Sequence, residues 1–110
     1  MLDLRLANPG SGRIGTNPEQ LLAAGWSASF ESALAIAARE RGIALPADLN
    51  IETAVSLELA DDGYFISVEF HIRLKDVDPK IAKTLVDQAH WICPFSKATR
   101  GNISVAMSVL

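Results

Sequence analysis

The sequence has 110 residues, a formal net charge of −3 and 49% hydrophobic residues. This length predicts a single domain, and the interspersed acidic and basic residues argue against a surface that binds nucleic acid or anionic membranes. Cys93 is the only cysteine, so a disulfide within the chain is excluded. With no signal peptide visible, a reducing, cytoplasmic compartment is expected.

The first predicted elements are a short strand and a long helix. The leucines of residues 2–6 alternate with less apolar residues, as in a strand. Asn17 and Pro18 then indicate a helix start, with Gln20 placed for a capping box. Gly42 marks the end of this helix, after about residue 41.

This helix is apolar on most sides, which predicts a central, buried element. Its length suits a membrane span. However, its serine and alanine content and its capping residues favour a core helix, so no membrane partner is expected. The main apolar stripe contains Leu22, Trp26, Ala33 and Ile36, with Ser29 inside it.

Two alternating stretches, residues 49–59 and 64–74, indicate strands. Asp62-Gly63 between them predicts a two-residue type I′ turn. Both apolar sets then share one face of the hairpin. The register that follows pairs Leu59 with Ile66, Leu57 with Val68, Val55 with Phe70 and Glu52 with Arg73.

Asp78-Pro79 indicates the start of a second helix, Pro94 interrupts it, and Gly101 ends a short helical piece. Residues 103–109 alternate as a final strand. The order predicts an α+β fold, in which a central buried helix packs on a mostly antiparallel sheet. The second helix has one apolar stripe, formed by Ile81, Leu85, Ala89 and Ile92.

Cys93 and Glu19 are candidate functional residues, each with a structural alternative. Cys93 precedes a helix start, where backbone N–H groups and the helix dipole favour a thiolate, but it also fits a buried cysteine that acts as a small hydrophobe. Glu19 lies in a first helical turn, where the dipole favours an acid, and it also fits a carboxylate that orients a catalytic partner.

Ser29 and the two histidines carry weaker signals. A serine on an apolar stripe is usually a packing residue that bonds back to the preceding turn. No Gly-x-Ser-x-Gly pattern surrounds Ser29, which argues against serine hydrolysis. His71 and His90 do not cluster with the single cysteine, so no metal site is expected.

Two longer motifs are more specific than any single residue. Residues 15–30 read GTNPEQLLAAGWSASF, and residues 93–103 read CPFSKATRGNI. They resemble GTNPEQLFAAGYSACF and CPYSxATRGNI, the active-site motifs of the organic-hydroperoxide-resistance (Ohr) branch of the OsmC/Ohr family. The resemblance covers essentially the whole chain, as one domain over residues 1–110, and implies an intertwined homodimer with active sites at the subunit interface.

The resemblance implies thiol-dependent reduction of organic hydroperoxides in oxidative-stress defence. In the family, a peroxidatic cysteine attacks the peroxide, a resolving cysteine forms a disulfide with it, and an external dithiol such as a lipoylated protein reduces the disulfide. No bound cofactor is implied. By position, Glu19 matches the family's orienting glutamate, Cys93 matches the resolving cysteine, and Ser29 stands where the peroxidatic cysteine is expected.

Two departures distinguish this sequence from the family. A serine hydroxyl has no sulfenic state, so the two-cysteine cycle is expected to be impaired, and whether the chain is an enzyme stays open. The family's arginine comes from N-terminal strands upstream of Leu2 that this sequence lacks, and Arg13 does not match its position. Ser29 fits an introduced replacement, a natural member without catalysis, or a one-cysteine route through Cys93.

Two non-catalytic functions also stay open. An interface pocket lined by Trp26, Phe30 and Phe95 would accept an organic hydroperoxide, or hold an apolar ligand without turnover. A structural relic that only dimerises is the other alternative. Spacing adds a constraint, since Glu19 and Ser29 are about 15 Å apart along one helix. A shared site would then need either a fold-back near Glu19 or residues from both subunits.

Overall fold

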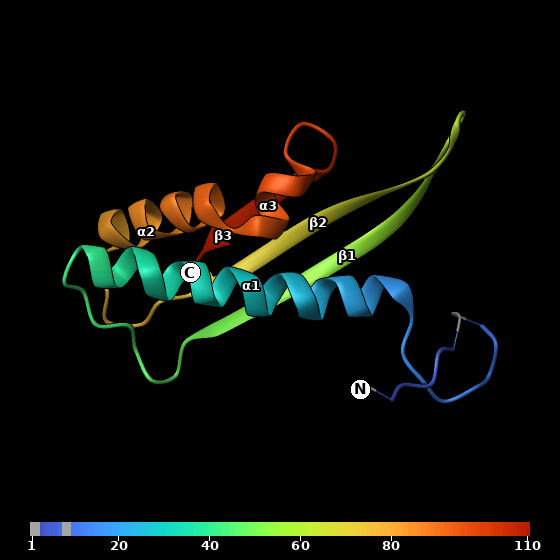
Figure 1. The fold of residues 1–110 in the computed structure, drawn as a ribbon, viewed down its shortest axis with the longest axis horizontal. Coiled ribbons are helices and arrows are strands. Elements are labelled where there is room, and N and C mark those ends of the chain that lie inside the picture. Colours follow the sequence, from blue (N-terminus) through green and yellow to red (C-terminus); the bar gives the residue numbers. More distant parts are fainter. Residues whose placement is uncertain (1–2, 8–9) are drawn as a thin grey trace.

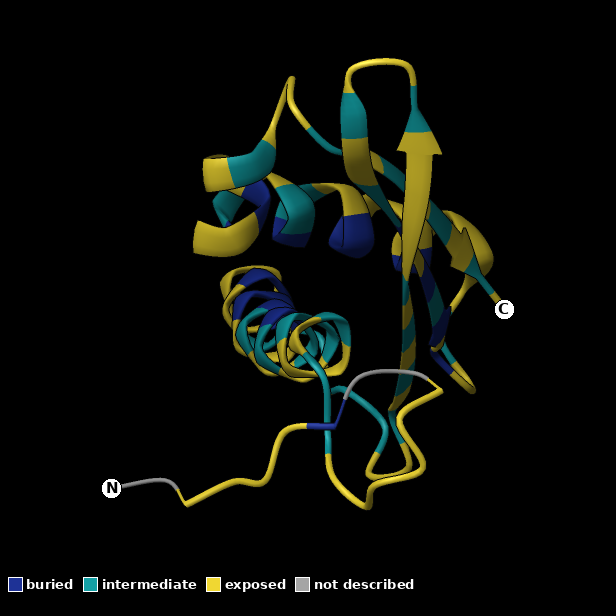
Figure 2. Cartoon of the chain, turned by 90° about the vertical axis from the view of Figure 1, so that its right-hand side faces the viewer, coloured by how far each residue is buried: buried dark blue, intermediate teal, exposed yellow. Residues whose placement is uncertain are grey.

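A computed structural model gives the fold, and it describes residues 3–7 and 10–110. Figure 1 shows α1 and α2 side by side, and Figure 2 shows the helices on one side of the sheet, so the domain has two layers. The expected α+β architecture is confirmed. The elements are α1 (Pro18–Glu40), β1 (Asn50–Ala60), β2 (Gly63–Arg73), α2 (Pro79–Ile92), α3 (Pro94–Thr99) and β3 (Ser104–Val109).

The three-stranded sheet is mixed, with β2 at its centre. β1 and β2 form the expected antiparallel hairpin, whereas β3 pairs with β2 in parallel. The parallel pairing follows because α2 and α3 carry the chain back across the sheet before β3 begins, as a crossover must for parallel neighbours. The antiparallel part of the prediction therefore applies to the hairpin only.

The hairpin register differs from the predicted one because the turn lies one residue earlier. Ala60 pairs with Gly63, so Asp61 and Asp62 form the turn, and Gly63 already belongs to β2 with a φ of +121°. The alternation of faces survives, because the pairing of one strand with the other is offset by two residues, which is one full period of the strand. The observed pairs include Leu57 with Ile66, Val55 with Val68, Thr53 with Phe70 and Glu52 with His71 instead of Arg73.

Both ends of α1 follow the local signals. The side chain of Asn17 accepts a hydrogen bond from the backbone N–H of Gln20 at 2.8 Å, and Gly42 follows the helix with a φ of +66°. The predicted capping box is not formed, because the Gln20 side chain accepts from the Thr16 hydroxyl at 2.9 Å. The cap thus rests on Asn17 alone.

One face of α1 is buried. Ile36 is 44% exposed, so the predicted stripe is wrong at that position. By length and apolar composition α1 is the one helix of the described chain that would suit a membrane span, but its contacts with α2 and β1 fit a core helix. Its buried residues are Trp26, Phe30, Ala33, Leu34, Ala37 and Ala38.

The core lies between the two helices and the sheet. α2 contributes Leu85 and Ala89, as predicted, whereas the predicted Ile81 is 42% exposed and its place is taken by neighbouring residues. The central strand supplies Val68, Phe70 and Ile72, all almost fully buried. Two-layer packing of this kind needs only one apolar face from each element. The full buried stripe of α2 is Ala82, Leu85, Val86 and Ala89.

The segment before α1 forms a bridge in place of the predicted strand. Leu2 lies outside the described residues, and residues 3–6 contain a single parallel bridge, between Leu6 and Thr16. The backbone N–H of Ala7 donates to the Thr16 carbonyl at 2.7 Å, and the Thr16 N–H donates to the Arg5 carbonyl at 2.8 Å. Two short backbone segments therefore run in close contact ahead of α1.

Gly15 is required where these segments meet. A Cβ at this position would lie 2.5 Å from the Arg5 carbonyl oxygen. We expect Gly15→Ala to speed amide exchange at Ala7 and Thr16 at least about fivefold, because overpacking costs at least ~1 kcal/mol. Gly25→Ala is the matched control, since its Cβ would meet Phe95 at an ordinary 3.6 Å. Equal exchange in both variants would contradict the close approach.

Candidate functional site

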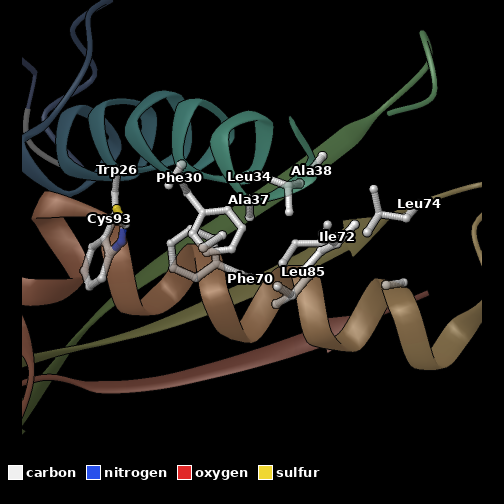
Figure 3. Close-up of a cluster of buried hydrophobic side chains, with 14 of the residues drawn as sticks. Trp26, Phe30, Leu34, Ala37, Ala38, Phe70, Ile72, Leu74, Leu85 and Cys93 are labelled. Atoms are coloured by element: carbon white, nitrogen blue, oxygen red, sulfur yellow. The ribbon is translucent and has the colours of Figure 1, made fainter. Parts of the chain in front are cut away.

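The contact between α1 and the start of α3 brings together the two positions that the motifs singled out. Ser29 Oγ and Cys93 Sγ are 3.5 Å apart, and either atom can be the donor. Cys93 is fully buried and Ser29 is partly buried. Figure 3 shows Cys93 at one end of the core cluster, beside Trp26. A pair 64 residues apart in sequence is thus in direct contact.

Cys93 occupies the corner between two helices. It is the C-cap of α2 and the N-cap of α3, with an extended backbone at φ −63° and ψ 125°. Its N–H donates to the Ala89 carbonyl, and its carbonyl accepts from the Lys97 N–H. The thiol makes no capping hydrogen bond of its own. Pro94 enforces this corner, because a residue before proline is disfavoured in the helical conformation. The thiol is therefore free to face Ser29.

A second polar contact joins the same helices and was missed from the sequence. The indole Nε1–H of Trp26 donates to Ser96 Oγ at 3.1 Å, and both residues are fully buried. Among the described residues, Ser96 is the single polar residue in the buried class. Buried polar groups are nearly always hydrogen-bonded. The second motif contains Ser96, but nothing in the sequence indicates that Trp26, 70 residues away, is its hydrogen-bond partner.

Glu19 is not brought to the Ser29–Cys93 contact. It lies in the first turn of α1, and Ser29 lies ten residues further along the same continuous helix. Instead, Glu19 lines a groove of about 600 Å³ between the start of α1 and β1. Thr53, Val55 and Leu57 form part of its opposite wall. Within one chain, the three predicted catalytic positions therefore form one pair and one separate carboxylate.

The three predicted pocket residues pack on the core. Trp26 stacks on Phe95, with ring centroids 6.4 Å apart, and meets Phe70 edge to face at 5.4 Å. Phe30 also contacts Phe70. Trp26 and Phe30 are fully buried, whereas Phe95 is 37% exposed. Phe95 is thus the member that solvent, or a ligand, can reach, and the pocket role of the set stays a prediction.

Arg100 fixes the corner from its outer side. Its guanidinium donates to the His90 carbonyl at 2.9 Å and to the Trp91 carbonyl at 3.4 Å. It also lies over the Trp91 ring, 4.5 Å from the centroid. A cation that hydrogen-bonds the last carbonyls of a helix stabilises that end. The arginine of the second motif therefore closes α2 just before Cys93.

The surroundings of His90 favour its neutral imidazole. Burial lowers its pKa, the nearby Arg100 lowers it further, and Asp87 acts in the opposite direction. Its Nδ1 has no hydrogen-bond partner within residues 3–7 and 10–110. In that same part of the chain, no three histidine, cysteine, aspartate or glutamate side chains are grouped to hold a metal ion. His71 lies on the outer face of the sheet, opposite Glu52.

The central pair defines what this arrangement can do. A hydroxyl beside a thiol exchanges a hydrogen bond and stores no oxidising equivalent. A thiol in place of the hydroxyl would stand in reach of Cys93 Sγ, from which a disulfide of about 2.05 Å needs only a small inward movement. The geometry therefore suits reversible sulfur oxidation, provided that position 29 carries sulfur.

Comparison with known proteins gives one family. The family model described as OsmC-like protein matches residues 9–108. The organic hydroperoxide resistance protein of Xanthomonas axonopodis pv. citri is 41% identical over 112 residues, which cover 98% of this chain and 79% of that protein. The organic hydroperoxide resistance protein OhrB of Bacillus subtilis is 38% identical over 99% of this chain and 82% of its own length.

Solved structures agree. The crystal structure of OhrB of Bacillus subtilis superposes with a TM-score of 0.93 at 42% identity, over 99% of this chain and 83% of that one. An organic hydroperoxide resistance protein from Vibrio cholerae, with captopril bound in one of its active sites, gives a TM-score of 0.90 at 36% identity, over 99% and 77% of the two chains.

Proposed function

Because the chain belongs to the OsmC-like family, we propose that it is an organic hydroperoxide resistance-type protein whose reacting position is residue 29. The contact between Ser29 Oγ and Cys93 Sγ carries this proposal. It joins the attacking and resolving positions of the family motifs at 3.5 Å. The names of the relatives support an organic hydroperoxide as the substrate class.

With serine at position 29, the two-cysteine cycle does not run in this chain. The cycle needs a thiolate that attacks one peroxide oxygen, so that an S–O bond forms, the O–O bond breaks and an alcohol leaves. The Cys93 thiol then displaces hydroxide from the sulfenic sulfur, and its proton completes a water molecule. An external dithiol reduces the resulting disulfide by exchange. Serine supplies neither the thiolate nor the sulfenic state.

The proposed working form is a cytoplasmic homodimer. Glu19 lies on the same straight helix as Ser29, about 15 Å along the axis. A second copy would supply the carboxylate at each reacting position. The far end of the hairpin also exposes apolar side chains, with Leu59 at 70% and Tyr64 at 71%. Figure 1 shows this end reaching past the helices. A partner subunit is the proposed cover for it.

A second candidate function is the binding of an apolar ligand without turnover. The groove beside Glu19 supports it, because Pro18, Ala23 and Val55 give its lining an apolar part. Its volume of about 600 Å³ is in the range of small-molecule sites. The two candidates differ in what happens to an organic hydroperoxide, which a peroxidase consumes and a binding protein releases unchanged.

The deciding experiment is single oxidation of the Ser29→Cys variant. We expect one equivalent of cumene hydroperoxide to convert it to a form lighter by two hydrogen atoms, with a 29–93 disulfide in the peptide map. The unmodified chain, which has one thiol, is the matched control and should keep its mass. An S29C chain that stays reduced while it binds the peroxide would support the binding function instead.

A further inference from the structure

Two contacts lie one above the other where α1 meets α3. The Ser29–Cys93 pair and the Trp26–Ser96 pair each join the same two segments, and their members differ by three positions along both. Residues three apart on a helix share a face. The buried Trp26–Ser96 hydrogen bond is therefore the neighbour of the contact at which the proposed disulfide forms.

The donor side of this hydrogen bond is rigid. The Trp26 ring is held between Phe95, which stacks on it, and Phe70, which meets it edge to face. Indole has one N–H, so its direction is set once the ring is fixed. Ser96 Oγ accepts it at 3.1 Å with both residues fully buried. Where Ser96 lies is thus determined by a ring on the other helix.

On the acceptor side, α3 meets Trp26 through the Phe95 ring and the Ser96 hydroxyl, and Arg100 ties the end of α3 to α2. α3 has six residues, Pro94–Thr99, and Ser96 is the only one of them in the buried class. Cys93 is the N-cap of this short helix. Because the peptide chain between Cys93 and Ser96 is helical, a shift of Ser96 moves Cys93 with it.

We propose that Ser96 is a positioning residue. Through its hydrogen bond with the Trp26 indole, it holds Cys93 Sγ in contact with the side chain at position 29. This rests on the proposed function, in which the Cys93 sulfur displaces hydroxide from an oxidised sulfur at position 29 once that position carries cysteine. Ser96 does not touch the reacting atoms. Its role is to hold Cys93 Sγ against position 29. When that position carries cysteine, as in S29C, the S–S bond then forms faster than further oxidation of the sulfenic acid.

The first test separates the two chemical steps in the S29C background. Sulfenic acid formation is measured by dimedone trapping in chains that also carry C93S, in which the disulfide cannot form. We expect S29C/C93S/S96A to form sulfenic acid at the same rate as S29C/C93S. Disulfide formation should fall at least tenfold. S96T keeps the hydroxyl and should restore most of the rate, whereas W26F removes the N–H while keeping an aromatic ring and should resemble S96A. Equal slowing of both steps would overturn the positioning role.

S27A is the matched control. Ser27 also lies on α1, and its hydroxyl donates to Thr53 on β1, away from α3. We expect S29C/S27A to form the disulfide at the rate of S29C. Thermal unfolding of each variant accompanies the rates, so that a loss of fold is recognised. A slowing in S27A as large as in S96A would attribute the effect to general loosening of α1 and refute the proposal.

The second test needs no peroxide. Equilibrium of the 29–93 disulfide with dithiothreitol measures the effective concentration of the two thiols. We expect S96A to lower it at least tenfold, a shift of about 30 mV for a two-electron couple. An unchanged equilibrium would overturn the proposal even if S29C reduces peroxides. If S96A lowers the effective concentration but the S29C chain does not react with peroxide, the positioning role is supported and the peroxidase function is refuted.

Discussion

Ser29→Cys is expected to raise steady-state consumption of an organic hydroperoxide, with excess dithiol present, at least about 100-fold above the unmodified chain. The reason is the nucleophile, since a thiol is a few per cent thiolate near neutral pH and a serine hydroxyl is essentially never ionised there. Cys93 already lies beside the reacting position at 3.5 Å. A coupled assay of peroxide loss against reductant oxidation measures the change.

Two variants locate the source of that activity. In S29C/C93S the first oxidation should remain, while turnover with a dithiol falls, because the resolving disulfide cannot form. Ser29→Ala should be as inactive as the unmodified chain. Consumption by the unmodified chain at the S29C rate would show instead that Cys93 works alone, by the one-cysteine route.

Phe70→Ala is expected to lower the free energy of unfolding by about 3–5 kcal/mol. Phe70 is fully buried on the central strand and contacts both Trp26 and Phe30, each with ring centroids 5.4 Å away. Its removal leaves a cavity beside the Trp26 and Phe30 rings of α1. Small domains are typically stable by only about 5–15 kcal/mol, so the loss is a large share. Urea unfolding followed by tryptophan fluorescence measures it.

Phe65→Ala is the control for that measurement. Phe65 lies on the same strand, is 47% exposed and pairs with Glu58 near the end of the hairpin. Its loss should cost under about 1.5 kcal/mol, because a half-exposed ring gives up less buried area. A Phe70 variant as stable as the Phe65 variant would mean that the core does not centre on β2.

Features set by neighbouring residues could be predicted from the sequence. Asn17 caps α1, Pro79 and Pro94 start α2 and α3, and Gly42 follows α1, because caps and breakers act within a few residues. The position of the hairpin turn could not be predicted as reliably from local residues. Asp61 and Asp62 occupy it, although Asp62-Gly63 is the stronger dipeptide signal. Strand alternation alone does not distinguish registers that differ by two residues.

Features that depend on distant segments could not be predicted from local patterns. Nothing in residues 103–109 says that β3 runs parallel to β2, since a strand's alternation is the same in either direction. Likewise, Ser96 reads as an ordinary helix serine until the Trp26 indole is seen against it. The motifs identified Ser29 and Cys93 through resemblance, and their contact required the folded chain.

The contact between positions 29 and 93 also links redox state to conformational stability. A disulfide there would close a loop of 64 residues, and on the chain-entropy estimate it would restrict the unfolded ensemble by about 4 kcal/mol. In a member with two cysteines, each oxidation would therefore make the protein harder to unfold and harder to digest. With serine at position 29 that cross-link is unattainable, so peroxide cannot raise the resistance to unfolding by this route.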